Sequence, residues 1–251
     1  MTMLSESDWL QAWERSCGQP AALRPCAVLA PLFEQGQAAA ERLSVGQRDA
    51  CLIDLCQALF GPGAHAVAHC PRCAELLEME LSLPQLRLPA PPEPEVGLAH
   101  GLELALDADG ARYRLSFRLP DSADLAAIAA WGGMDAAKQA LLGRCVIQAS
   151  RNDLPVAVAA LPPTVVAALA QAMAEADPQA ASELALECPA CGHRWNEVFD
   201  ISHFLLHALD DWAQRLLDQV HMLAKAYGWT EATVLALTPM RRARYLERVL
   251  A

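Results

Sequence analysis

Two cysteine pairs carry the clearest chemical signal in this sequence. Each pair has the pattern Cys-Pro-x-Cys, with Cys70 and Cys73 in the first and Cys188 and Cys191 in the second. Two residues between the cysteines let both sulfurs of one tight turn face the same ion, and a tetrahedral zinc needs two such turns. We therefore predict that these four cysteines are the metal ligands of one structural Zn²⁺ per chain.

The separation of the two pairs along the chain constrains the architecture. Zinc ribbons usually space their pairs by about 15 to 20 residues, whereas a far longer segment lies between Cys73 and Cys188. The ribbon must therefore be split around an insertion. One alternative is a redox role for each pair, which favours a βαβ context with the first cysteine at a helix N-terminus. Neither pair has that context, and thiols without a metal are the remaining alternative.

Histidines near the cysteines and further along the chain are weaker candidates. His69 and His193 adjoin the pairs and could replace a sulfur, but with four cysteines available we expect hydrogen-bond donors or exposed side chains. His203 and His207 stand four apart on a predicted helix, a spacing that can bind a metal. The glutamate of a zincin-type protease is missing between them. A site of four cysteines has no open position for substrate, and we predict no catalytic residues and no enzymatic activity.

Composition narrows the classes of function. The chain has 251 residues and a formal net charge of −11, which disfavours contact with nucleic-acid phosphates. No run of about 18 apolar residues predicts a membrane span. The acidic N-terminus lacks an apolar signal core, so we expect a cytoplasmic protein. Nine cysteines, an odd number, argue against a complete disulfide framework. We expect core packing for the other five: Cys17, Cys26, Cys51, Cys56 and Cys145.

Local patterns predict helices at both ends and strands beside the cysteines. Ser5 with Asp8, and Ser44 with Gln47, resemble the capping boxes that begin helices. An Asp109-Gly110 turn between two alternating runs predicts a β-hairpin. Further strands are predicted at 76–83 and 195–201, and further helices at about 134–150, 162–176 and 203–227, with two short helices after the last. Four arginines near the C-terminus (241, 242, 244 and 248) predict a solvated helix face, the alternative being a contact for an acidic partner or RNA.

These elements predict an α+β fold that is mostly helical. The expected organisation is an N-terminal helical region (1–62), a split four-cysteine zinc ribbon of two β-hairpins (63–87 and 183–201), an inserted lobe of a β-hairpin plus helices (97–182) and a C-terminal helical region (202–251). A proline-rich segment at 89–94 precedes the inserted lobe. Because such segments are stiff and extended, we interpret it as a linker that marks a domain boundary.

Several sequence blocks occur in a fixed order with both cysteine pairs, at 45–49, 59–62, 117–125, 174–180, 188–195, 227–231 and 241–246. This order resembles a family of proteins encoded with contractile phage tails and contractile injection systems. Its members are described as baseplate proteins, or as relatives of the T-even phage baseplate hub assembly chaperone, and the resemblance covers about 45–250. One departure is Ala74, where a glycine is more usual after the first pair. The resemblance implies no enzymatic activity.

Two classes of function follow. The first is an assembly factor or structural component of the baseplate of a phage-like contractile tail or injection system, with baseplate, hub or spike proteins as partners. Such a protein would be incorporated into a phage-like particle or help to build it. The alternative is a zinc-ribbon regulator that binds nucleic acid, which the acidic charge disfavours.

Overall fold

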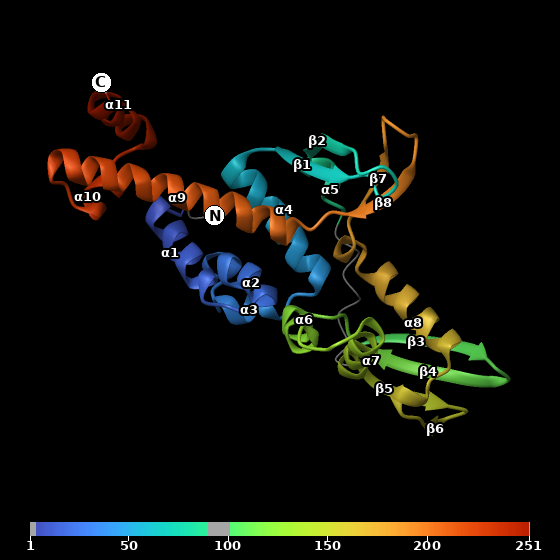
Figure 1. Cartoon of the computed structure of the whole chain (residues 1–251). Coiled ribbons are helices and arrows are strands. Elements are labelled where there is room, and N and C mark those ends of the chain that lie inside the picture. The colour runs from blue at the N-terminus through green and yellow to red at the C-terminus, as the bar shows by residue number, and fades with distance from the viewer. Residues whose placement is uncertain (1–3, 90–100, 251) are drawn as a thin grey trace.

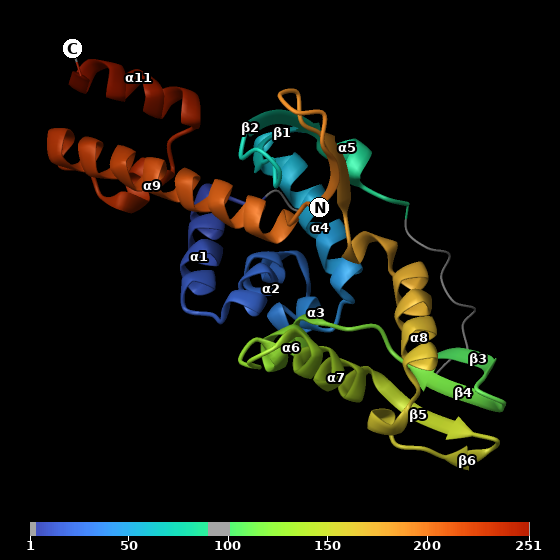
Figure 2. The same cartoon turned by 45° about the vertical axis from the view of Figure 1, so that its right-hand side comes forward.

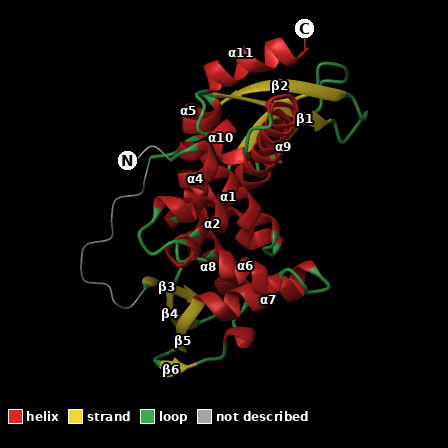
Figure 3. Cartoon of the chain, turned by 90° about the vertical axis from the view of Figure 1, so that its left-hand side faces the viewer, coloured by secondary structure: helices red, strands yellow, loops and turns green. Residues whose placement is uncertain are grey.

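The computed structural model describes residues 4–89 and 101–250. It is a mixed α+β structure in which helices dominate and the strands form small sheets. Most of the predicted linker lies outside the described residues. No helix within the described ranges is both long and apolar enough to cross a membrane. Figure 3 shows β1 and β2 toward one end of the molecule and β3 to β6 at the other, with α1, α2, α4 and α6 among the helices between them.

The N-terminal region is helical, as predicted. Both expected capping boxes are present: the hydroxyls of Ser5 and Ser44 accept from the backbone N–H groups of Asp8 and Gln47, whose side chains accept from the serine N–H groups in turn. The helices are α1 (Glu6–Cys17), α2 (Arg24–Leu29), α3 (Gln37–Glu41) and α4 (Val45–Phe60), with short 3-10 turns η1 (Ala21–Leu23) and η2 (Ala30–Leu32).

These helices share one core with the long helix α9 (Ile201–Tyr227). The buried side chains include Leu29, Ile53 and Leu205, which come from α2, α4 and α9. Asp200 caps the start of α9 by accepting from the N–H of His203. Gly228 ends the helix in a left-handed conformation with φ 66°, which favours glycine. Figures 1 and 2 show α9 lying across α1 and α4, so the two ends of the sequence form one helical body.

Each cysteine pair lies at the tip of a β-hairpin. Strands β1 (Gly63–His69) and β2 (Leu76–Ser82) flank the first pair, and β7 (Glu183–Glu187) and β8 (Arg194–Val198) flank the second. The two hairpins are separate two-stranded sheets. The predicted strand at 195–201 is shorter than expected, because Asp200 already caps α9. A single turn, α5 (Leu83–Leu86), follows the first hairpin.

The segment between the hairpins has its own core. Strands β3 (Leu102–Ala108) and β4 (Ala111–Phe117) form the predicted hairpin, and both residues of its Asp109-Gly110 turn have positive φ. The helices of this segment are α6 (Ser122–Ile128), α7 (Met134–Cys145) and α8 (Pro163–Ala176), with 3-10 turns η3 (Val158–Ala160) and η4 (Pro178–Ala180). Tyr113, Leu115 and Phe117 of β4 pack against Val165 and Leu169 of α8.

The predicted helix at 134–150 is wrong in its C-terminal part. Helix α7 ends at Cys145, and β5 (Val146–Arg151) pairs with β4, while β6 (Leu154–Pro155) pairs with β5. The sheet therefore has four strands rather than the two of the expected hairpin. The physical reason is a second tight turn, because Asn152 and Asp153 both adopt positive φ between paired residues.

The C-terminal helices match the prediction. Helix α10 (Glu231–Leu235) and α11 (Pro239–Leu250) fold back on the end of α9. Val220, Leu223 and Val234 are buried there, and Trp229 and Tyr245 pack against them with ring centroids 4.9 Å apart. These aromatic side chains are therefore part of a small third core.

Candidate metal centre

The two cysteine turns have the same backbone hydrogen bonds. In the first turn, the N–H of Cys70 donates to the carbonyl of Glu75, and the N–H of Ala74 donates to the carbonyl of Cys70, both at 2.9 Å. The second turn repeats both bonds at 2.9 Å, from Cys188 to His193 and from Gly192 to Cys188. Each turn is thus closed by its own backbone and holds its two thiols on one side.

The turn requires one residue in the left-handed region. Gly192 occupies this position in the second turn with φ 68°, and Ala74 occupies it in the first with φ 60°. The left-handed conformation costs an L-residue about 1–2 kcal/mol, a cost that glycine avoids. The departure noted in the sequence at Ala74 therefore lies at the one turn position where glycine is favoured.

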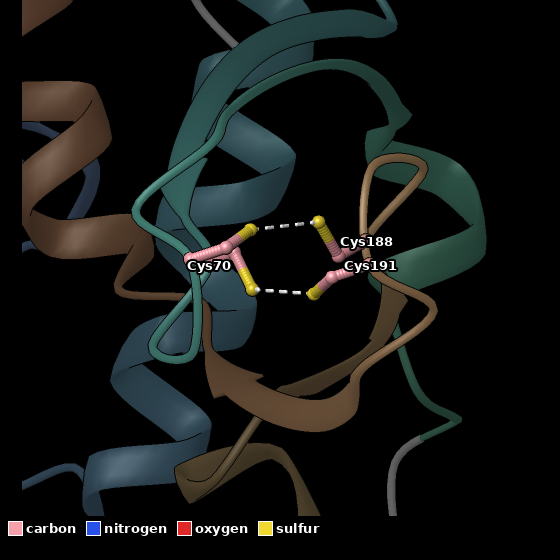
Figure 4. A group of neighbouring side chains, drawn as sticks. Cys70, Cys188 and Cys191 are labelled. Carbon is pink, nitrogen blue, oxygen red and sulfur yellow. Dashed lines mark hydrogen bonds between the residues drawn. The ribbon is translucent and has the colours of Figure 1, made fainter.

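All four sulfurs come together. The Sγ atoms of Cys70 and Cys191 are 3.7 Å apart, those of Cys73 and Cys188 are 3.5 Å apart, and all four lie within 4.8 Å of one another. A tetrahedral zinc with Zn–S bonds of about 2.3 Å places its sulfurs about 3.8 Å apart. Figure 4 shows Cys188 and Cys191 pointing from their turn toward Cys70. The spacing fits a tetrahedral ion.

Burial at the cluster is uneven. Cys70 and Cys188, the first cysteines of each pair, are 2% and 1% exposed, whereas Cys73 is exposed and Cys191 is half-buried. Burial opposes ionisation of Cys70, but hydrogen bonds from the backbone N–H groups of Cys73 and Arg72 outweigh it and lower its pKa to about 7. A hydrogen bond from the backbone N–H of Glu75 favours the Cys73 thiolate. Hydrogen bonds with the other three cysteine sulfurs, together with burial, favour the neutral thiol more strongly and raise the pKa of Cys73 to about 12. Cys73 therefore stays a neutral thiol at ordinary pH unless a bound cation favours its thiolate.

The candidate histidines do not join the cluster. His69 is exposed, and His193 stacks on Trp195 with ring centroids 5.9 Å apart. His203 and His207 are exposed on α9 with ring centroids 4.3 Å apart. Within residues 4–89 and 101–250, the four cysteines are the only group of three or more His, Cys, Asp or Glu side chains close enough to share an ion.

The other five cysteines follow the core-packing prediction with one exception. Cys26, Cys56 and Cys145 are buried and Cys51 is half-buried, whereas Cys17 is exposed at the end of α1. Burial raises the pKa of the Cys56 and Cys145 thiols to about 11, so both are neutral at ordinary pH.

The fold buries one of the four C-terminal arginines and leaves the other three exposed. The predicted solvated face holds for Arg241, Arg244 and Arg248, which are exposed. Arg242 is instead 4% exposed and donates to both carboxylate oxygens of Glu6 at 2.6 and 2.8 Å. This arginine therefore joins α11 to the start of α1, and only the other three are available to a partner.

A groove that the sequence did not predict lies beside the metal centre. It has a volume of about 730 Å³ and is bounded by residues 65–69 of β1, by residues 197–200 between the end of β8 and the start of α9, and by the first turns of α9, including His203 and His207. We call it the hairpin groove, and Figures 1 and 2 show the two hairpins side by side near the start of α9. No pattern within one segment reveals it, because its walls come from both ends of the insertion.

The fold and the cluster define a mixed α+β protein with four cysteines placed to bind a metal. Comparison with known proteins then identifies the family. The family described as "T4 bacteriophage base plate protein" matches residues 27–206, and the chain belongs to it. No curated protein matches the chain significantly. No solved structure does so either.

Proposed function

We propose that this protein is a non-enzymatic assembly factor or structural component of the baseplate of a phage-like contractile tail or injection system. The observation that carries the proposal is the family match over 27–206. Membership of a baseplate family implies contact with other baseplate components, and hub and spike proteins are the partners we propose.

We propose further that Cys70, Cys73, Cys188 and Cys191 bind one structural Zn²⁺. The sulfur spacings of 3.5 and 3.7 Å and the paired turns support a tetrahedral ion. Sulfur-only ligation favours zinc or an iron–sulfur centre over hard cations. With all four positions filled by protein, such an ion would stabilise the fold and leave no place for a substrate.

In this proposal the two hairpins form a split zinc ribbon, and the shared ion holds the two ends of the insertion close together. The ribbon comprises 63–87 and 183–201, and residues 97–182 form the inserted lobe. The separate core around Tyr113 and Leu169 supports this division. A metal that joins segments so distant in sequence restricts the unfolded chain most strongly, because the closed loop is long.

Deletion of the gene tests the functional proposal in cells that produce the particle. We expect cells without the protein to accumulate unassembled components and to yield no complete sheathed particles under the electron microscope. Complete particles at the normal yield would contradict the proposal. Mass spectrometry of purified particles then separates the two roles, since a component is retained in the particle and an assembly factor is not.

A further inference from the structure

The register of the first hairpin shows which backbone groups of β1 are free. Leu83 donates to the carbonyl of Pro62, and Cys70 donates to that of Glu75. In an antiparallel pair, hydrogen-bonded positions alternate with positions whose N–H and C=O point away. The residues at 64, 66 and 68 therefore bond to β2. His65, Val67 and His69 present their N–H and C=O groups at the opposite edge.

The second hairpin also leaves backbone groups of its outer strand, β8, free. Cys188 donates to His193, and Phe199 donates to Ser182, so these are hydrogen-bonded pairs. The alternating position between Phe199 and Glu197 is Val198, whose N–H and C=O point away from β7. Neither β1 nor β8 pairs with a further strand in the part of the chain that the structure describes.

Both free edges border the hairpin groove. Residues 65–69 of β1 line it, and so do residues 197–200, which comprise the last two residues of β8 and the two residues that lead into α9. Since successive side chains of a strand point to opposite faces, a cavity that meets consecutive residues meets the strand at its edge. Val67 and Val198 are 67% and 64% exposed there.

Among the described residues, the free edge of β1 carries no lysine, proline or bulge that would protect it against pairing. Exposed edges are normally guarded by lysine, proline, a bulge or a covering element. Strand β1 reads Gly-Ala-His-Ala-Val-Ala-His and pairs with β2 without a break in register over all seven residues. Such an edge is a template for an added strand.

The groove also indicates the chemistry of an added strand. Phe204 and Ala208 of α9 provide apolar surface in it. With histidine neutral, the charged side chains that line it are Glu197, Asp200 and Asp211, all of them acidic and exposed. A segment that carries both apolar and basic side chains would therefore complement the lining of the groove.

We propose that the hairpin groove binds an extended segment of a partner protein, in which apolar residues alternate with lysine or arginine, as an additional strand on the free edge of β1. The backbone of His65, Val67 and His69 would supply the hydrogen bonds. This inference goes beyond the proposed function, because it names a surface and a kind of partner segment. Particle assembly could depend on the protein and yet not on this edge.

The test uses the full chain and the fluorescently labelled peptide acetyl-(Val-Lys)4-amide, with its Val-Glu counterpart for comparison. Val67→Pro removes an edge N–H that β2 does not use. The matched control is Glu78→Pro, because Glu78 is the cross-strand partner of Val67 and its N–H points to the other edge of the hairpin. Far-ultraviolet circular dichroism checks that both variants fold alike.

We expect the lysine peptide to bind the native chain at least tenfold more tightly than the glutamate peptide. Val67→Pro should weaken binding at least tenfold, while Glu78→Pro changes it less than twofold. Hydrogen exchange should show new protection of the Val67 amide on binding. Equal weakening by both variants, or no binding of the lysine peptide, would overturn the inference. So would a dimer of the chain that only Val67→Pro abolishes, since the occupant would then be a second copy.

Discussion

The backbone N–H of Gly46 donates a 2.9 Å hydrogen bond to a carboxylate oxygen of Asp177, which is buried. Gly46 lies at the start of α4, before the segment between the two hairpins, and Asp177 lies within that segment, directly after α8. A carboxylate at a helix N-terminus is favoured, because it accepts from an otherwise unpaired N–H and faces the positive end of the helix dipole. This contact joins the inserted segment to the N-terminal helices.

The start of α4 makes a second contact with the insertion. Val45 donates from its N–H to the carbonyl of Pro120 at 3.0 Å, and the Arg48 guanidinium donates to the Ser122 hydroxyl at 3.1 Å. The blocks at 45–49, 117–125 and 174–180, which carry the family resemblance, therefore meet at one junction. These blocks lie far apart along the chain, and their contacts hold the segment between the two hairpins against the start of α4.

The first prediction concerns the close approach at Gly46. A Cβ at this position would lie 2.0 Å from Asp177 Oδ1 and 2.8 Å from the backbone N of Ala180. Gly46→Ala should therefore destabilise the protein by roughly 1–3 kcal/mol, as overpacking of a filled site does. Chemical denaturation measures the loss.

Gly143 provides the matched control for Gly46. It also lies within a helix, α7, but a Cβ added to Gly143 would have no atom within 4 Å beyond its own helix backbone and chain neighbours. Gly143→Ala should be neutral or stabilise by up to about 1 kcal/mol, because alanine is the better helix former. Equal effects of the two substitutions would show that the Gly46 contact is not tight.

The second prediction concerns Asp124, which is fully buried between two arginines. Burial opposes its ionisation, but the hydrogen bonds from Arg118 at 2.6 and 2.9 Å, and from Arg144 at 2.7 Å, hold the pKa of this carboxyl well below its usual range. Asp124→Asn should lower the free energy of unfolding by roughly 2–3 kcal/mol at pH 7. This loss is smaller than is usual for breaking a fully buried ion pair, because Arg118 and Arg144 are partly exposed to water.

The pH dependence of that cost follows from the sign of the shift. Because the folded-state pKa lies below the unfolded value of about 3.9, the contribution of Asp124 is complete above about pH 5 and is lost as the pH falls further. The stability difference between native protein and Asp124→Asn should therefore shrink below about pH 4. Asp153→Asn, which breaks the exposed pair with Arg114, should cost less than about 0.5 kcal/mol. A difference that grows on acidification would contradict this account.

The third prediction compares equivalent positions in the two cysteine turns. Ala74→Gly should stabilise the protein by about 1 kcal/mol, and Gly192→Ala should destabilise it by a similar amount, because both positions have positive φ. For a chain of this size, each change corresponds to a shift of about 2–4 °C in the melting temperature. Shifts of the same sign would mean that the two turns do not share one conformation.

The features that the sequence predicted well are local ones. The Cys-Pro-x-Cys spacing located both turns, and the capping boxes at Ser5 and Ser44 located the starts of α1 and α4. In each case, the residues that determine the structure lie within a few positions of one another. The Asp109-Gly110 turn belongs to the same class, since a two-residue turn fixes the register of its strands.

Apart from the convergence of the four cysteines, which the paired motifs predicted, the features that depend on distant partners were not predicted. Strand β5 follows α7 without a break, and only its pairing with β4 makes it a strand. The role of Arg242 depends on Glu6 at the other end of the chain. The hairpin groove was not predicted either, because a shared metal site predicts that the two hairpins approach but not which residues line the space between them.

The measurement that tests the central claim most directly is the metal content of the purified full-length chain, by inductively coupled plasma mass spectrometry. The account predicts about one zinc per chain, lost together with much of the thermal stability in Cys70→Ser and Cys188→Ser. Cys17→Ser, which changes an exposed cysteine outside the cluster, should retain the ion. A native chain without zinc, or a Cys188→Ser variant that keeps a full equivalent of zinc and the native melting temperature, would contradict the account.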